Sequence, residues 1–248
     1  MSNSLKKLAL RIKKCKKCSL WRTRIQAVPG EGNLKAKILI IGEAPGKEED
    51  KQGRPFCGRA GKFLDELLKI ANLKRQEVFI TNVVKCRPPK NRRPKKEEIE
   101  KCRPWLVEQI KILKPKLIIT LGALALNWFS SRMFDRLVPR FRFRAGDSIG
   151  KFNKSSIPRR PSTDLPVGES GVARKGMVSS EARPLRYPKT KISQVHGCYK
   201  KFEIGNLKLK IFSTYHPAAA FRRGNLRKIL KKDFTKIQEI KRRVLKGN

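Results

Sequence analysis

The sequence predicts an α/β fold in which a mostly parallel, four-stranded sheet is covered by helices on both faces. Short apolar runs typical of buried strands occur at 37–41, 78–84, 117–121 and 207–214. Segments with apolar residues at helical spacing lie between them. Strands that alternate with helices favour parallel pairing, because each connecting helix packs back onto the sheet.

The first elements are an N-terminal helix and one strand–loop–helix unit. Residues 4–14 place leucine and isoleucine at helical spacing, with Ser4 as the expected N-cap, and deliver Cys15 to the end of the helix. After a loop rich in glycine and proline, 37–41 is a short apolar run that predicts a buried strand. Residues 61–70 then have the apolar spacing of a helix.

The second strand, at 78–84, is followed by a basic, proline-rich loop at 87–94. A helix is expected to begin near Lys95 and to carry Cys102. Pro104 is expected to kink or divide this helix, because proline removes a backbone donor and clashes with the preceding turn.

The second half of the chain continues the alternation, with one interruption. The strand at 117–121 runs into a helix at 123–129, and the strand at 207–214 precedes a long basic helix at 225–246. Between them, 146–194 is rich in Ser, Pro, Gly, Arg and Lys and has few periodic apolar residues. We expect an exposed, flexible basic insertion there, because such a composition buries too little apolar surface to offset ordering entropy.

The charge balance predicts a polyanionic partner. The chain has 61 Lys and Arg residues against 20 Asp and Glu residues, a net charge of +41. Such an excess neutralises phosphates and gives salt-sensitive affinity for nucleic acid without selecting a sequence. Because the basic residues are spread along the chain, DNA or RNA is favoured over a membrane surface. Adaptation of a whole proteome to salt or heat is the alternative explanation.

The compartment is predicted from what the sequence does not contain. No apolar run approaches the ~18 to 20 residues of a membrane span. Residues 1–14 alternate apolar and basic side chains and do not resemble a secretory signal. We therefore expect a soluble, intracellular, cytoplasmic protein with no membrane partner, and one associated with the nucleoid if the host is a prokaryote.

Six cysteines in such a compartment are better candidates for metal binding or catalysis than for disulfides. Cys15 and Cys18 form a C-x2-C pair, while Cys86 and Cys102 are separated by fifteen residues. Four thiolates suit either zinc or an iron–sulfur cluster, although zinc ribbons more often use two C-x2-C pairs. The other two, Cys57 and Cys198, have no evident partner.

Unusual residues follow three of the predicted strands, where ligands bind in open α/β sheets. The first loop reads G-E-A-P-G from Gly42 and continues as G-R-P-F-C-G-R-A-G, which brings Glu43 and Phe56 into one segment. Asn82 ends the second strand, and His216 follows the last one. Taken singly, each has a structural explanation as a cap, a core side chain or a turn former.

Taken together, these motifs resemble those of the family 4, iron–sulfur-containing uracil-DNA glycosylases along nearly the whole chain except the insertion. The resemblance is carried in order by G-E-A-P-G, G-R-P-F-x-G-R-A-G, T-N-V-V-K-C-R-P-P, N-R-R-P and Y-H-P-A, together with the cysteine spacing. It implies a three-layer α/β/α sandwich, a single domain over 1–248 with the insertion within it, and hydrolysis of the N-glycosidic bond of uracil in DNA. It also implies a [4Fe–4S] cluster held by four cysteines: Cys15, Cys18, Cys86 and Cys102.

The resemblance also implies roles for the uracil-binding residues Gly42, Glu43, Phe56, Asn82 and His216. A base within a duplex must be flipped into a pocket before it can be cut. Phe56 would stack on the extruded uracil, and the Asn82 carboxamide would match its O4 and N3–H groups. His216 would donate to O2, where negative charge develops, and Glu43 would either stabilise the sugar cation or position water.

Further expectations concern DNA contacts beyond the pocket. Phe221 would wedge into the duplex, although a core phenylalanine is an equal alternative, and Arg59, Arg222 and Arg223 would bind phosphates. The expected partner is DNA containing uracil, duplex or single-stranded, bound by a monomer. Two rival functions are a non-catalytic iron–sulfur protein that binds nucleic acid and a glycosylase for another deaminated base.

Overall fold

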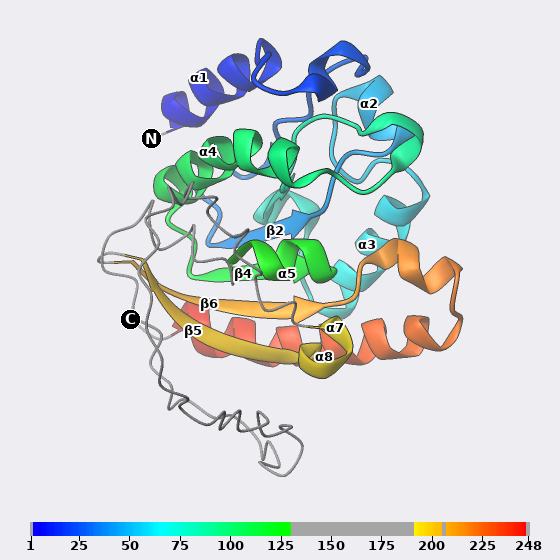
Figure 1. Cartoon of the computed structure of the whole chain (residues 1–248). Coiled ribbons are helices and arrows are strands. Elements are labelled where there is room, and N and C mark those ends of the chain that lie inside the picture. Colours follow the sequence, from blue (N-terminus) through cyan, green and yellow to red (C-terminus); the bar gives the residue numbers. More distant parts are fainter. Residues whose placement is uncertain (1, 130–190, 205–206, 247–248) are drawn as a thin grey trace, which may run out of the picture.

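The computed structural model describes residues 2–129, 191–204 and 207–246, and helices cover both faces of one central sheet (Figure 1). The four central strands are parallel and lie in the order β3 (Phe79–Asn82), β2 (Ile38–Gly42), β4 (Leu117–Leu121) and β6 (Leu207–Thr214). Chain order and spatial order differ because β3 lies on one side of β2, and the chain then crosses to the other side of β2 to form β4 and β6. The predicted α/β fold with a mostly parallel sheet is therefore confirmed.

The predicted count of four strands is wrong, since the described residues form six. The two further strands are antiparallel edges: β1 (Glu31–Gly32) pairs with β3, and β5 (Cys198–Ile204) pairs with β6. β1 has only two residues, too few for any periodicity. β5 mixes lysines and a glutamate with its apolar residues, a pattern that an edge strand with one neighbour tolerates.

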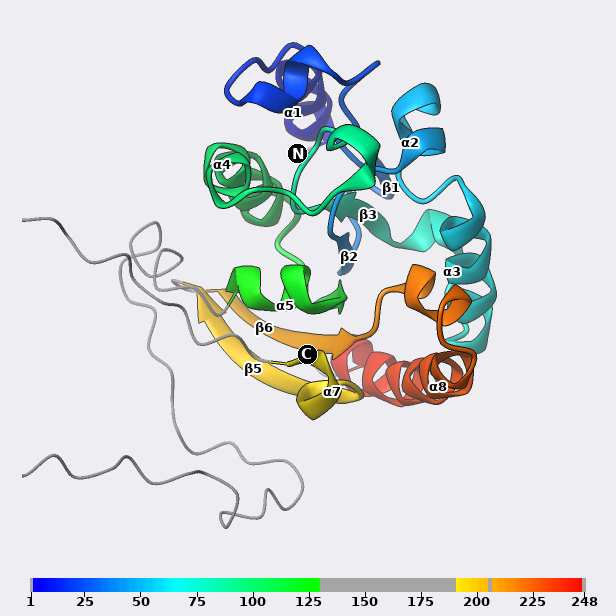
Figure 2. The same cartoon turned by 45° about the vertical axis from the view of Figure 1, so that its right-hand side comes forward.

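Strand residues alternate between two apolar layers. On one face, Leu39 and Ile41 of β2 pack with α1 (Ser2–Lys13), α4 (Lys96–Leu113) and α5 (Ala123–Phe129). On the other face, Ile38 and Ile40 pack with α3 (Arg59–Ile70) and α8 (Asn225–Lys246). Figure 2 shows these two helical layers on opposite sides of the sheet. Both faces of β2 and β4 are buried at every residue, which explains their continuous apolar runs.

Helix α4 corrects the expectation for Pro104, because the helix continues through that proline without being divided. Its buried side contributes Trp105, Leu106 and Ile110 to the core. This burial offsets the backbone hydrogen bond that proline removes.

The short elements lie mostly in loops around the sheet. Two are α-helices, α2 (Lys47–Gln52) and α7 (Ile192–Val195), and neither was predicted. The others are 3₁₀ turns: η1 (Ser19–Arg22), η2 (Arg75–Glu77), η3 (Pro89–Asn91) and η5 (Pro217–Phe221). Residues 146–190 of the expected insertion lie outside the described residues, and its last residues, from Ile192, are helical. In the described part of the chain, no helix is long and apolar enough to cross a bilayer.

Candidate active site and metal centre

The chemistry-bearing loops meet at the carboxyl ends of the parallel strands. Gly42 ends β2 and pairs in register with Asn82, which ends β3. His216 follows the last residue of β6 by two positions and is the N-cap of η5. Because parallel strands end at one edge of a sheet, residues far apart in the chain face the same space.

Phe56 and His216 form the first pair of this site. Their ring centroids lie 5.6 Å apart with an interplanar angle of 29°, a stacked arrangement. Phe56 is buried, and its backbone has a φ of 51°, in the left-handed region that few non-glycine residues adopt. Gly61 makes this possible, because a Cβ atom at that position would collide with the Phe56 carbonyl group. The loop conformation is thus strained at the residue that carries the aromatic ring.

Asn82 lies near the Phe56 ring, on the other side of Gly42 in the sheet. A Cβ atom at Gly42 would collide with both the Asn82 carboxamide and the Phe56 ring, so both side chains converge on this glycine. Asn82 is only 1% exposed, and its Oδ1 atom has no hydrogen-bond partner within the described residues. A buried, unpaired acceptor costs roughly 1 to 3 kcal/mol, so a folded protein retains one where a ligand completes it.

The imidazole of His216 is held in one protonation state. Its Nδ1 accepts a hydrogen bond of 3.2 Å from the Ala218 backbone N–H, which places the ring proton on Nε2. Desolvation lowers the pKa of His216 to about 4, and the Arg222 guanidinium acts in the same direction while Glu49 opposes it. At neutral pH the site therefore presents a neutral imidazole that carries its proton on Nε2.

Glu43 is a half-buried carboxylate directly after Gly42. Its backbone carbonyl accepts from the Val84 N–H at 3.2 Å, which ties the loop after β2 to the segment after β3. Burial raises the pKa of Glu43, and the positive charges of Arg93 and Arg222 counteract that rise. The Glu43 carboxylate therefore lies in the positive field of two arginines, Arg93 and Arg222.

Glu49 organises the loops of the site, and sequence reasoning missed it. Its Oε2 accepts from the Gly46 N–H at 3.0 Å, while its Oε1 accepts from the N–H groups of Cys57 and Gly58 at 3.1 and 3.0 Å. One carboxylate thus joins the loop after β2 to the loop that carries Phe56. The missed signal was a glutamate three residues after Gly46, the spacing of a capping box at the start of α2.

The surface beside Glu43 and His216 carries the expected DNA-contacting residues. Phe221 is 41% exposed, with its ring edge-on to Phe63 at 6.1 Å and the Arg59 guanidinium 4.5 Å from its ring centroid. Arg222 and Arg223 follow it and are exposed. The alternative of a core phenylalanine at 221 is therefore wrong, because the ring lies on the surface against α3.

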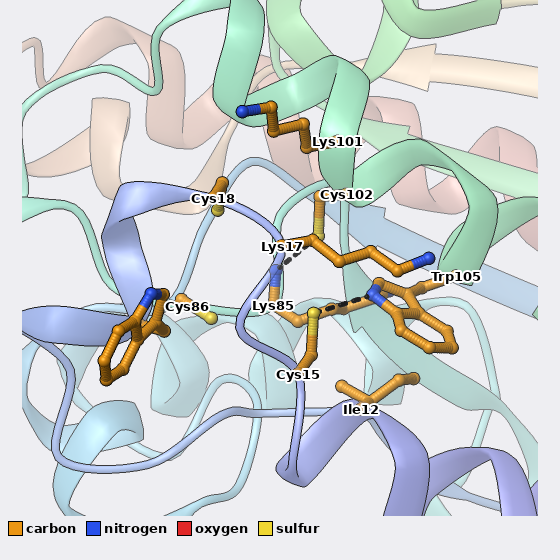
Figure 3. A pocket seen from close by; sticks show the side chains of 10 residues that line it. Ile12, Cys15, Lys17, Cys18, Lys85, Cys86, Lys101, Cys102 and Trp105 are labelled. Carbon is orange, nitrogen blue, oxygen red and sulfur yellow. Dashed lines mark hydrogen bonds between the residues drawn. The ribbon is translucent and has the colours of Figure 1, made fainter.

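The four predicted metal ligands lie together. Cys15, Cys18, Cys86 and Cys102 all line one pocket between the N-terminal segment, the loop after β3 and α4 (Figure 3). All four are free thiols, with Cys86 and Cys102 buried. Their neighbours at the pocket are mixed basic and apolar side chains: Ile12, Lys17, Trp21, Lys85, Lys101 and Trp105.

Hydrogen-bond donors point at the sulfur atoms. N–H groups donate to three of the four: Arg24 Nη1 to Cys86 at 2.8 Å, the Trp105 indole to Cys15 at 3.3 Å, and the Lys85 backbone amide to Cys102 at 3.3 Å (Figure 3 draws the last two). Such bonds favour thiolates, the form that binds metal.

Burial acts against these thiolates. It raises the pKa of Cys18 and Cys86, and that of Cys102 to about 12. Positive charge in the pocket would counter that effect and make thiolate ligands stable. Among the described residues, no three Cys, His, Asp or Glu side chains converge closely enough to hold a single ion. The arrangement is instead four thiols around a shared space.

Comparison with known proteins assigns the chain to a family. The model of the uracil DNA glycosylase superfamily matches residues 29–239. The chain is 41% identical over 239 residues to a type-4 uracil-DNA glycosylase of Sulfurisphaera tokodaii, covering 96% of this chain and 85% of that protein. It is 38% identical to the type-4 uracil-DNA glycosylase of Saccharolobus solfataricus, over 96% of this chain and 86% of the relative. The type-4 uracil-DNA glycosylase of Archaeoglobus fulgidus is 36% identical, over 96% and 93%.

Proposed function

Because the chain belongs to the uracil DNA glycosylase superfamily, and within it to the type-4 uracil-DNA glycosylases, we propose that the site at the strand ends cuts the N-glycosidic bond of uracil. The protein is a DNA repair hydrolase that releases uracil from DNA. The proposal concerns how its own residues do so. It requires a deoxyuridine nucleotide extruded from the stack, since the bond is inaccessible within a duplex.

Asn82 reads the extruded base. Its unpaired Oδ1 accepts from uracil N3–H, and its Nδ2 donates to uracil O4. Cytosine presents the opposite pattern, an acceptor at N3 and a donor at the exocyclic amine, so it would leave the buried amide unsatisfied. A site built for two such bonds discriminates strongly, because the wrong base leaves its polar groups unpaired. This unpaired buried acceptor is the observation that carries the proposal.

Phe56 supplies the aromatic surface on which the extruded base stacks. Its ring stacks on the flipped pyrimidine and excludes water from that face. The strained loop conformation and the contact with Gly42 hold the ring before the base arrives. The binding free energy is therefore not spent on ordering the loop.

His216 stabilises the leaving group. As the bond breaks, its electrons move to the uracil ring, and negative charge develops at O2. The Nε2–H of a neutral imidazole donates to that oxygen, and the Ala218 N–H keeps the ring in the required tautomer. Asn82 and His216 both lie near the Phe56 ring, so both donors act on one departing base.

Glu43 acts on the sugar side. Its carboxylate either stabilises the oxocarbenium-like deoxyribose or holds the attacking water and accepts its proton. Both roles require an ionised carboxylate, which the nearby Arg93 and Arg222 favour. Water attacks C1′ of the sugar and the uracil anion leaves, which yields an abasic site.

The four pocket cysteines hold a [4Fe–4S] cluster in this proposal. Four thiols spread around one space suit a cluster whose four irons each take one thiolate. Zinc, which needs all its ligands at one point, remains the alternative to be tested by metal analysis. The cluster would link the N-terminal segment to the loop after β3, so its contribution is structural.

Binding to DNA uses the net charge of +41 and the surface beside the pocket. Phe221 enters the space that the base leaves, and Arg59, Arg222 and Arg223 contact flanking phosphates. We further propose that the chain acts as a monomeric, intracellular, single glycosylase domain over 1–248, with 146–194 as a basic insertion.

A glycosylase assay on duplex and single-stranded oligonucleotides with one uracil, followed by alkaline cleavage, tests the site. We expect cleavage at uracil, and none at cytosine, hypoxanthine or a mismatched thymine. Strong binding without abasic product would indicate the non-catalytic rival. Preferred release of another base would overturn the role of Asn82. Iron, zinc and sulfide analysis of the same preparation decides the metal.

A further inference from the structure

Lys85 is the most unusual charged residue of the described chain, and the proposed chemistry does not use it. Its side chain is 1% exposed and is among the largest that are fully buried. Within the described residues, no carboxylate lies within ion-pair distance of its ammonium group. An unpaired buried charge is costly, so a lysine in this position requires a physical reason.

The hydrogen bonds of Lys85 are complete. Its three ammonium protons match three oxygen atoms, each 2.7 Å from Nζ: Thr81 Oγ1, the Asn82 backbone carbonyl and Gln109 Oε1. Two of these partners are anchored in turn, because the Thr81 hydroxyl and the Gln109 amide both donate to the Pro29 carbonyl, at 2.8 and 2.7 Å. The network is thus closed, and the Asn82 backbone is one of its members.

The same residue contacts the cysteine pocket. Its backbone N–H donates to Cys102 Sγ, and its side chain lines the pocket of the four thiols (Figure 3). The thiol groups beside Lys85 are Cys86, the next residue in the chain, and Cys102, whose Sγ accepts its backbone N–H at 3.3 Å. A metal–thiolate group with net negative charge is therefore the partner that a buried cation here would otherwise lack.

We propose that Lys85 is a positioning residue that joins the cysteine pocket to the base pocket. Its ammonium group balances the charge of the metal-bound thiolates and holds the Asn82 main chain, which aims the carboxamide at uracil. The inference rests on the proposed role of Asn82. Lys85 touches neither base nor sugar, and it acts through Asn82 alone.

Replacement of Lys85 by methionine tests this link. Methionine has a similar length and leaves the hydrogen bond from the backbone N–H to Cys102 Sγ in place. We expect kcat for uracil release to fall by about 10- to 100-fold. KM should change by less than about threefold, since the contacts to DNA phosphates remain. The cluster, followed by visible absorption and iron content, should be lost to a chelator at least about threefold faster. Lys111→Met is the matched control, because Lys111 is an exposed lysine of α4 outside the pocket lining, and the variant should behave like the unaltered protein within about twofold.

A double-mutant cycle separates positioning from simple structural support. In an Asn82→Leu background, Lys85→Met should reduce the residual rate by less than about threefold, because the residue through which it acts is already absent. Equal loss in both backgrounds, or unaltered activity and cluster retention, would overturn the proposal. If Lys85→Met does not fold, Gln109→Met removes one acceptor and should show the same non-additivity on a smaller scale, and additivity there overturns it. Absence of uracil release by the unaltered chain would refute the proposed function instead, while chelator resistance would still report on Lys85.

Discussion

Replacing Asn82 by leucine should make the protein more stable and nearly inactive, a combination that only a preformed ligand site produces. In the free protein the Asn82 Oδ1 is buried without a partner. Leucine has a similar volume and no polar atom, so the substitution removes that penalty. Of the roughly 1 to 3 kcal/mol that such an atom costs, we expect about 1 kcal/mol to be recovered after imperfect repacking against Gly42 and Phe56. For a chain of this length that corresponds to roughly 2 to 4 °C in Tm.

The loss of activity follows from the same side chain. Two hydrogen bonds to uracil disappear, and at about 1.4 to 2.7 kcal/mol each they represent a loss of about 10²- to 10⁴-fold in single-turnover rate. Urea unfolding and excision kinetics on one preparation measure both effects, and affinity for uracil-free duplex should stay within about twofold.

The control for Asn82→Leu is Asn33→Leu. Asn33 is exposed, and its Oδ1 already accepts from the Lys35 N–H at 2.8 Å. This variant should be slightly less stable and fully active. A destabilised Asn82→Leu protein that retains its rate, or one that loses stability and DNA affinity together, would refute the reasoning.

Three further outcomes are expected. Gly61→Ala should slow excision and lower the free energy of unfolding by about 1 to 3 kcal/mol, because the added methyl group collides with the Phe56 carbonyl. Gly224→Ala, with open space around it, should do neither. Equal effects of the two substitutions would count against the strained loop. Stability should fall as pH drops from about 6.5 to about 4, because folding lowers the pKa of His216 and the unfolded chain binds its proton first; His216→Asn should flatten that part of the urea-unfolding profile. Cys86→Ser should lose iron, colour and stability, whereas Cys198→Ser, away from the pocket, should retain all three; a coloured, stable Cys86→Ser protein would exclude it as a ligand.

Much of the fold could be predicted because the central strands are buried on both faces. A run such as 37–41 is apolar throughout for that reason, and it marks a strand without knowledge of its neighbours. The long amphipathic helix α8 and the strand β6 were predicted with the bounds that the structure gives. The edge strands could not be found in this way, because β5 exists through its pairing with β6, and β1 is too short to have a pattern.

The candidate site could be predicted as a set of residue types but not as a geometry. Glycines, an amide, an imidazole and a carboxylate after strand ends are visible in the sequence, and the cysteine spacing indicates a metal centre. Glu49 escaped notice because α2 is only six residues long and its acidic run reads as an exposed surface. Pro104 was expected to kink or divide its helix, and tertiary packing keeps that helix undivided.

By itself, the amino-acid sequence determined what depends on local composition: which segments are buried strands, where ligands can attach, and that the partner is a polyanion. Only the tertiary structure decided which buried polar groups lack a hydrogen-bond partner, which backbone is strained and which charged side chain is buried. The orphaned Asn82 oxygen, the left-handed Phe56 beside Gly61, and the buried Lys85 bonded to the Asn82 carbonyl all depend on contacts between distant segments. Hydrogen bonding and desolvation depend on the environment of a side chain, and that environment exists only after the chain has folded.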